Sequence, residues 1–222
     1  MTAIRTILFD LDGTLLDRSS SLKVFLHRQI ERLPQLLGPL PFADYMDRVV
    51  DLDAHGHGPK DQVWESVAAH FGLPPGTGAL LLDDFFTFFP DTCVPFPKAH
   101  QTLAGLRQRG LRLGLVTNGR VNSQQPKIDG LGLGDYFDAV LISEAEGVSK
   151  PAAEIFLRAL QRLDATAEET VMVGDNPSAD IAGAQACGMK AIWKRDTYWE
   201  PPTAADGVVG ELEELPGVIA GL

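Results

Sequence analysis

The sequence has little of three features that mark particular classes of protein. Only two of its 222 residues are cysteines, Cys93 and Cys187, and they form no Cys-x-x-Cys pair, which excludes a disulfide framework and a zinc ribbon. No run of about 18 apolar residues occurs, so we expect no transmembrane helix. Basic residues number 19 against 30 acidic ones, and the net charge of −11 argues against nucleic acid or an anionic membrane as a partner. No targeting segment is visible, and we expect a cytoplasmic protein.

What the sequence does contain is a series of short apolar runs that alternate with helical patterns. Runs dense in Val, Ile and Leu are typical of strands buried on both faces. These runs are Thr6–Leu11, Leu111–Val116, Ala139–Ile142, Thr170–Val173 and Lys190–Trp193. The predicted helices between them are Pro97–Arg109, Pro151–Leu163 and Pro177–Cys187. This alternation predicts an α/β fold, with a Rossmann-like parallel sheet and helices on both faces.

The stretch from Asp17 to Pro90 has a different pattern, with no clear strand run. Its helical candidates are Ser20–Leu33, Phe42–Leu52, Lys60–Phe71 and Thr77–Phe89. Proline and glycine residues separate these candidates, as they commonly do between helices. We therefore predict an α/β core domain of residues 1–16 and 91–222, and a small α-helical domain of residues 17–90 inserted after the first strand.

Two carboxylates, Asp10 and Asp12, follow the first strand in the segment Asp-Leu-Asp-Gly-Thr. Residues at i and i+2 of an extended segment point the same way. At the carboxyl end of a parallel strand they would face the crevice where open α/β sheets bind ligands. Like charges held so close are costly unless a cation or a proton shares the site. On this motif alone, an ordinary Asp-Gly turn remains an alternative.

Three more polar motifs follow predicted strands or precede a helix. Thr117–Gly119 (Thr-Asn-Gly) offers a hydroxyl, an amide and a bare backbone N–H, which suit phosphate oxygens but also form ordinary turns. Lys150 precedes a proline that we expect in the first turn of a helix. Asp175 and Asp180 leave another strand in Gly-Asp-Asn-Pro-Ser-Ala-Asp, and they indicate either a hard cation or acids favoured at a helix N-terminus.

Taken together and in this order, the motifs resemble those of the haloacid-dehalogenase-like hydrolase superfamily: DxDGT, a strand-end Thr, Lys-Pro and GDxxxxD. The resemblance covers Arg5–Leu16 and about Phe96–Leu215. By its position and length, the helical insert looks like the cap of the branch that contains phosphoglycolate phosphatase and haloacid dehalogenase. The resemblance implies a Mg²⁺-dependent phosphatase that acts on a small phosphate monoester.

The resemblance also implies catalytic roles. Asp10 would be the nucleophile that forms an aspartyl-phosphate, and Asp12 the general acid for the leaving oxygen and then the base for water. Thr117, with the backbone of Asn118 and Gly119, would hold the phosphoryl group. Lys150 would neutralise Asp10 and the phosphate. We expect Asp12 to hold a proton near neutral pH because neighbouring carboxylates raise its pKa.

The implied metal ligands are Asp10, the Asp12 carbonyl and Asp175, with Asp180 supporting the set. Elementary electrostatics agrees, because a phosphate dianion beside four carboxylates is untenable without Mg²⁺ and Lys150. Outside the motifs, Lys60 is a candidate substrate contact. It ends a Gly-rich loop of the insert and carries a donor suited to an anion.

Three alternatives remain. A 2-haloacid dehalogenase would use the same nucleophile on carbon, but it needs no general acid, so Asp12 favours phosphorus. A sugar phosphomutase would use the same core motifs. A phosphate-binding module with an inactive site is the alternative that is not an enzyme.

Overall fold

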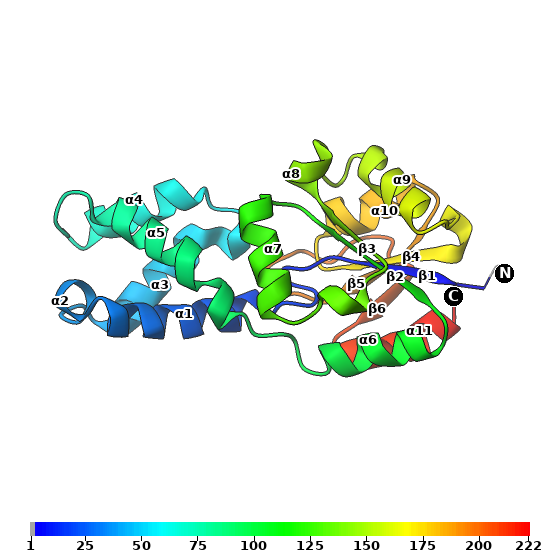
Figure 1. Cartoon of the computed structure of the whole chain (residues 1–222), viewed down its shortest axis with the longest axis horizontal. Coiled ribbons are helices and arrows are strands. Elements are labelled where there is room, and N and C mark those ends of the chain that lie inside the picture. The colour runs from blue at the N-terminus through cyan, green and yellow to red at the C-terminus, as the bar shows by residue number, and fades with distance from the viewer. Residues whose placement is uncertain (1–2) are drawn as a thin grey trace. The chain divides into compact units, whose positions relative to one another are not determined.

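The computed structural model describes residues 3–222, and the chain divides into two compact units. One unit combines the chain up to Leu16 with Pro95–Leu222, and we call it the α/β unit (Figure 1). The other, Asp17–Val94, is the helical unit. It ends at Val94 rather than Pro90 because the 3-10 turn Pro90–Thr92 continues directly from the last helix of this unit.

The α/β unit is built on a sheet of six parallel strands in the order β3-β2-β1-β4-β5-β6. The strands are β1 (Thr6–Phe9), β2 (Arg112–Thr117), β3 (Ala139–Ile142), β4 (Thr170–Gly174), β5 (Lys190–Lys194) and β6 (Gly207–Val209). The parallel sheet and its first five strands are confirmed. We did not predict β6, because a run of three residues is too short to stand out as an apolar pattern.

The strand order fixes where a site can form. The chain moves outward from β1 through β2 to β3, and then returns to the other side of β1 to add β4. Crevices at such reversals, outside the carboxyl ends of the strands, are where open α/β sheets bind ligands. Phe9 pairs with Leu115 of β2 and with Val173 of β4, so Asp10, Thr117 and Asp175 all lie at this one edge.

Helices cover both faces of the sheet, as predicted. Figure 1 shows α9 and α10 on one side and α6 and α11 on the other. The helices of this unit are α6 (Ala99–Gln108), α7 (Val121–Gly130), α8 (Ser143–Glu146), α9 (Ala153–Arg162), α10 (Gly183–Ala186) and α11 (Leu215–Ala220). The apolar stripe of α9, including Ile155 and Phe156, packs on Leu8 and Met172 of the sheet. Burying each such side chain contributes roughly 1.5–3 kcal/mol.

Two helical predictions for this unit need correction, and α7 was missed. The helix expected from Pro151 begins at Ala153, because a turn closed by the Ala152 N–H and the Ser149 carbonyl precedes it. The helix expected over Pro177–Cys187 is a π-helical turn, Pro177–Ala182, followed by α10. We did not predict α7, because it contains Pro126, a residue that usually ends or kinks a helix.

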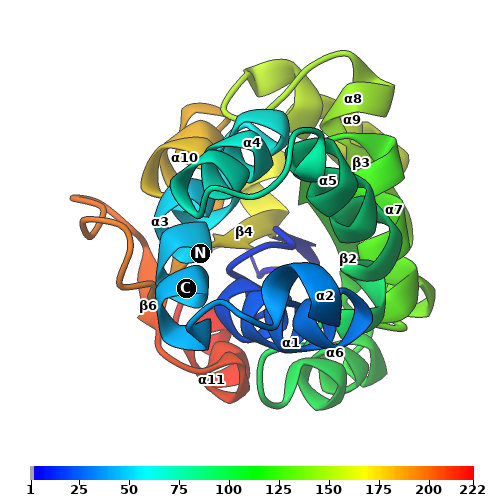
Figure 2. The ribbon, with the colours of Figure 1, turned by 90° about the vertical axis from the view of Figure 1, so that its left-hand side faces the viewer.

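The helical unit contains the four helices predicted for it, and one short addition. They are α1 (Arg18–Arg32), α2 (Pro34–Leu37), α3 (Phe42–Asp53), α4 (Lys60–His70) and α5 (Thr77–Phe88). Helix α1 begins where the Asp17 carboxylate accepts a hydrogen bond of 2.9 Å from the Ser20 N–H, a good N-terminal cap. Helices α4 and α5 run side by side (Figure 2).

Aromatic side chains fill the core of the helical unit. Phe25 makes edge-to-face contacts with Trp64, Phe85 and Phe89, at centroid separations between 5.4 and 6.1 Å. Tyr45 is buried with them. Such ring pairs add stability beyond the area they bury. Within residues 3–222 the structure has no helix both long enough and apolar enough to traverse a membrane.

Candidate active site

Three buried carboxylates, Asp10, Asp175 and Asp180, converge at the carboxyl edge of the sheet. Asp10 follows β1, Asp175 follows β4, and Asp180 lies in the π-helical turn after β4. One oxygen of each carboxylate lies within 4.8 Å of one oxygen of the others. Oxygen donors gathered in this way form the kind of ligand set that a hard divalent cation takes.

Lys150 lies among these carboxylates. Its Nζ donates to Asp10 Oδ1 at 2.6 Å and to Asp180 Oδ1 at 2.7 Å, and its side chain is 1% exposed. Burial alone would lower the pKa of the Lys150 ammonium, but the charges of Asp10 and Asp180 raise it above its ordinary value. Lys150 is therefore a permanent cation that links Asp10, after β1, to Asp180 in the turn after β4.

One lysine leaves two of the three negative charges unbalanced, and the pKa values reflect this. Burial raises the pKa of Asp10 well above its ordinary value; Lys150 opposes this rise, while Asp180 and Asp175 add to it. Burial, followed by the charge of Asp180, raises the pKa of Asp175 to about 7. A bound divalent cation would supply the missing positive charge, so the residues present fit Mg²⁺.

The segments around Asp175 are shaped to hold its carboxylate. A Cβ added at Gly13 would lie 2.5 Å from Asp175 Oδ2, and Gly13 has a φ of +84°, so only glycine suits this place in the loop after β1. The indole N–H of Trp199 donates to Asp175 Oδ2 at 2.9 Å. The indole N–H of Trp193, from β5, donates to the Asp175 carbonyl at 2.6 Å. Asp175 is thus fixed from three sides.

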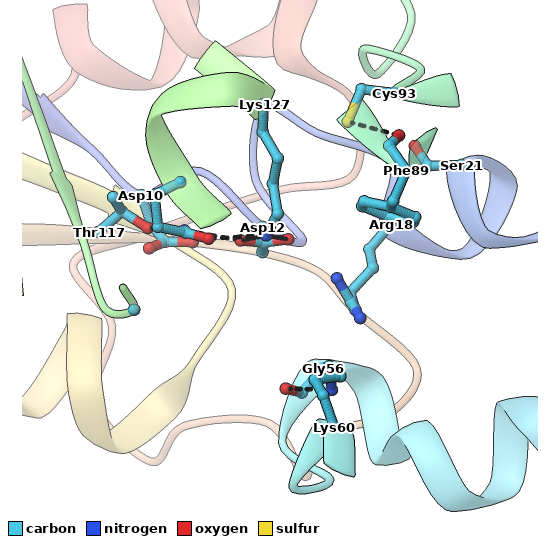
Figure 3. Close-up of polar contacts among 12 residues, drawn as sticks. Asp10, Asp12, Arg18, Ser21, Gly56, Lys60, Phe89, Cys93, Thr117 and Lys127 are labelled. Atoms are coloured by element: carbon cyan, nitrogen blue, oxygen red, sulfur yellow. Dashed lines mark hydrogen bonds and ion pairs between the residues drawn. The ribbon is translucent and has the colours of Figure 1, made fainter. Parts of the chain in front are cut away.

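The Asp12 carboxylate has a different environment from the one expected. Lys127 Nζ lies 2.9 Å from each of its two oxygens, and Gln124 Nε2 donates to its Oδ2 at 2.9 Å. Figure 3 shows the Lys127 side chain extending from its helix toward Asp12. A cation and a carboxamide thus hold this side chain. The proton that we expect on Asp12 near neutral pH stays a prediction.

The Thr-Asn-Gly segment after β2 is tied to two other parts of the site. Thr117 Oγ1 accepts a hydrogen bond of 2.6 Å from Gln124 Nε2. The Asn118 carboxamide exchanges two hydrogen bonds, both 2.9 Å, with the backbone of Lys150, and so fixes the loop that carries this lysine. The Gly119 N–H donates to Ser143 Oγ at 2.9 Å. A contact between this N–H and a phosphoryl oxygen stays a prediction, and that contact would have to replace the bond to Ser143.

Sequence reasoning missed Gln124, Lys127 and Trp199. The first two lie on α7 at a spacing of i and i+3, which places them on one face of a helix. That spacing is the only signal the sequence offers, and Pro126 hides the helix that gives it meaning. Trp199 lies outside the regular elements, and no pattern connects it with Asp175.

Lys60 belongs to the helical unit, at the start of α4. Its Nζ lies 2.9 Å from Asp53 Oδ1 and donates to the carbonyls of Gly56 at 3.0 Å and Gly58 at 2.7 Å. Figure 3 shows the bond to Gly56. Lys60 therefore closes the Gly-rich loop that precedes it. Its contact with a substrate stays a prediction.

Comparison with known proteins decides the family. Residues 4–188 match the model for haloacid dehalogenase-like hydrolases. The chain belongs to this family. The match includes the strands that lead to Asp10, Thr117 and Asp175.

Two curated relatives matched over most of their length are named phosphatases. The chain is 34% identical over 197 residues to ribulose-1,5-bisphosphate 5-phosphatase of Halopiger xanaduensis, covering 84% of this chain and 82% of the relative. It is 32% identical over 245 residues to glyceraldehyde 3-phosphate phosphatase of Pyrococcus furiosus, covering 99% and 94%. Among solved structures, the magnesium-bound HAD-hydrolase YfnB of Bacillus subtilis aligns with a TM-score of 0.78 and 26% identity, covering 98% of this chain and 99% of YfnB.

Proposed function

We propose that this hydrolase is a Mg²⁺-dependent phosphatase that cleaves a small phosphate monoester through an aspartyl-phosphate on Asp10. The observation that carries the proposal is the cluster of Asp10, Asp175 and Asp180 around Lys150, with the hydroxyl of Thr117 at the same edge of the sheet. Phosphoryl transfer needs mainly positioning and neutralisation of charge, which such a cluster supplies. The phosphatase names of two relatives matched over most of their length favour phosphorus as the atom attacked.

Asp10, Asp175 and the backbone carbonyl of Asp12 would hold Mg²⁺, with Asp180 supporting them. The unbalanced negative charge of the cluster and the magnesium bound to YfnB support this assignment. When bound, Mg²⁺ neutralises phosphate charge and so allows a dianion to approach carboxylates.

The protein groups divide the reaction into two displacements. Asp10 attacks phosphorus, the bond to the ester oxygen breaks, and that oxygen takes the proton that Asp12 holds when the substrate binds. Asp12 then removes a proton from water, whose oxygen attacks phosphorus and expels the Asp10 carboxylate with release of inorganic phosphate. Lys150 orients Asp10 through their hydrogen bond and balances the charge of the phosphoryl group.

The helical unit is, in our proposal, the cap that selects the leaving group. Its position supports this: the chain enters it directly after the Asp10 loop, and the Asp17 N–H donates to the carbonyl of Val94, so its two ends lie together. We also propose a cytoplasmic enzyme with no nucleic-acid partner, because the net charge is −11 and Cys93 and Cys187 form no disulfide.

A panel of phosphate monoesters tests the function, with released phosphate measured with Mg²⁺ and with excess chelator. We expect hydrolysis of at least one small ester with Mg²⁺, loss of that hydrolysis with chelator, and none with Asp10→Asn. Chelator-resistant hydrolysis would contradict the metal assignment. Chloride release from 2-chloropropionate without phosphatase activity would favour the dehalogenase. Isomerisation of a sugar phosphate without net phosphate release would favour the phosphomutase.

A further inference from the structure

We propose that Lys127 and Gln124 are positioning residues that hold the acid–base carboxylate Asp12 and orient the Thr117 hydroxyl. The proposal rests on the phosphatase function above and extends it to two residues of α7. The polar chain that carries it runs from Lys127 to Gln124, and from Gln124 to both Asp12 and Thr117, with every link between 2.6 and 2.9 Å.

The direction of each hydrogen bond in this chain is fixed by chemistry. An ammonium only donates, so the atom of Gln124 that lies 2.7 Å from Lys127 Nζ must be its carbonyl oxygen. The amide nitrogen of Gln124 then faces Asp12 and Thr117 and donates one proton to each. Thr117 Oγ1 is thereby an acceptor in this bond, which leaves its own proton for another oxygen. In a phosphatase that oxygen belongs to the phosphoryl group.

Because Lys127 is buried, breaking its ion pair with Asp12 would be energetically costly. The Lys127 side chain is 6% exposed, whereas the Asp12 side chain is 25% exposed. An ammonium withdrawn from water is costly unless a charged partner and hydrogen-bond acceptors remain beside it. Lys127 therefore fixes the position of the Asp12 carboxylate, which is the more accessible of the two groups. An acid that must meet the leaving oxygen needs such a fixed place, because proton transfer requires hydrogen-bond distance.

Gly119, in the loop after β2, leaves space for the Gln124 side chain to reach Asp12 and Thr117. Gly119 has a φ of +147°, and a Cβ added there would lie 2.9 Å from Gln124 Cγ. Glycine therefore lets the loop pack directly on the glutamine stem. The N–H of Gly119 is a predicted phosphate contact, and the missing side chain of Gly119 also makes room for Gln124.

The leaving group provides the decisive measurement, because only steps that use Asp12 should suffer. An alkoxide needs the proton of Asp12, whereas a nitrophenolate hardly does. For Lys127→Met we expect formation of the aspartyl-phosphate to slow by about 10-fold or more with an alkyl phosphate. With nitrophenyl phosphate, the burst of nitrophenol should keep its rate and the steady state that follows should slow, because attack by water needs the base. Lys127→Arg should recover part of the loss.

A double variant shows whether Lys127 acts through Asp12. In the Asp12→Asn background, Lys127→Met should change each rate by less than about 2-fold, because residues that act as a unit are not additive. Lys190→Met is the matched control: Lys190 Nζ pairs with Asp206 at 2.8 Å in the same unit, outside the site. It should leave all rates unchanged. Equal slowing of aspartyl-phosphate formation with both substrates by Lys127→Met, or additive loss in the double variant, would overturn the proposal.

Gln124→Met gives a test that does not depend on turnover. Removing the donor to Thr117 should weaken binding of inorganic phosphate, measured calorimetrically with Mg²⁺, by about 5-fold or more, the value of one hydrogen bond of about 1 kcal/mol. Unchanged phosphate affinity in a variant that melts as wild type would refute the role for Gln124. Failure of the phosphatase proposal has a separate signature, since wild-type enzyme would then release no phosphate from any ester, whatever the variants bind.

Discussion

Each unit of the molecule buries a cluster in which the numbers of acidic and basic groups differ, and the two clusters are unbalanced in opposite senses. In the α/β unit, Lys150 faces Asp10, Asp175 and Asp180. In the helical unit, Asp53 is paired with two cations: Arg18, whose Nη2 lies 2.7 Å from Asp53 Oδ1, and Lys60, at 2.9 Å.

The pKa values of the aspartates show what the difference means. Burial raises the pKa of Asp175 to about 7. Burial would also raise the pKa of Asp53, but Arg18 and Lys60 outweigh it and lower the pKa to about 2. The acid-rich cluster carries more carboxylates than its single ammonium can balance, a pattern that is common at ligand sites. The cation-rich cluster satisfies its carboxylate, which marks a structural joint between α1 and the loop before α4.

The largest contrast comes from removing one carboxylate of the acid-rich cluster. Asp10→Asn should abolish turnover, because no covalent intermediate can form. In metal-free buffer the same change should leave the free energy of unfolding unchanged or raise it by about 1–2 kcal/mol, since one repelling charge is gone. Phosphate release and urea denaturation measure the two effects. A variant that is inactive and also strongly destabilised would contradict the view of this cluster as a strained ligand site.

The cation-rich cluster should behave in the opposite way. Arg18→Met leaves the buried Asp53 with one partner fewer, and we expect a loss of about 3–5 kcal/mol in the free energy of unfolding. Lys60→Met should cost less, because this side chain is 19% exposed and Arg18 remains paired with Asp53. Urea denaturation of both variants gives the comparison. If Lys60→Met cost as much as Arg18→Met, the ranking by burial would be wrong.

The two clusters also differ in how far sequence could predict them. The carboxylates of the α/β unit follow strands whose apolar runs place their ends at one edge, so Asp10 and Asp175 could be brought together from the sequence alone. Arg18 and Asp53 lie 35 positions apart on two helices, and only the folded packing of α1 and α3 joins them. Lys127 was missed because Pro126 obscures the helix that presents it, and its contact with Asp12, 115 positions away, also depends on folded packing.

Mg²⁺ should stabilise the protein through the acid-rich cluster. At about 100 times its dissociation constant, a cation that binds only the folded state adds about 2.7 kcal/mol, which a rise in melting temperature reports. Asp175→Asn should lose most of this rise, while Asp53→Asn, which changes the other cluster, should keep it. An equal rise in both variants would place the binding of Mg²⁺ outside the cluster.

Acid should lower the free energy of unfolding through the cation-rich cluster, by slightly less than Mg²⁺ raises it through the acid-rich cluster. The folded-state pKa of Asp53, about 2, lies below its ordinary value of 3.8, so the charged form favours folding by about 2 kcal/mol. The sign follows from the depressed pKa: this stability is fully present above about pH 4 and is lost as the pH falls through about 2.

Other carboxylates also titrate in that range, so the free energy of unfolding is best measured for wild type and Asp53→Asn side by side. The asparagine variant cannot gain or lose this proton. The advantage of wild type should therefore shrink by about 2 kcal/mol between about pH 5 and pH 2. A difference that stays constant over this range would mean that Asp53 has the same proton affinity folded and unfolded. The cation-rich cluster would then stabilise the fold by packing alone, and the contrast between the two clusters would lose its electrostatic basis.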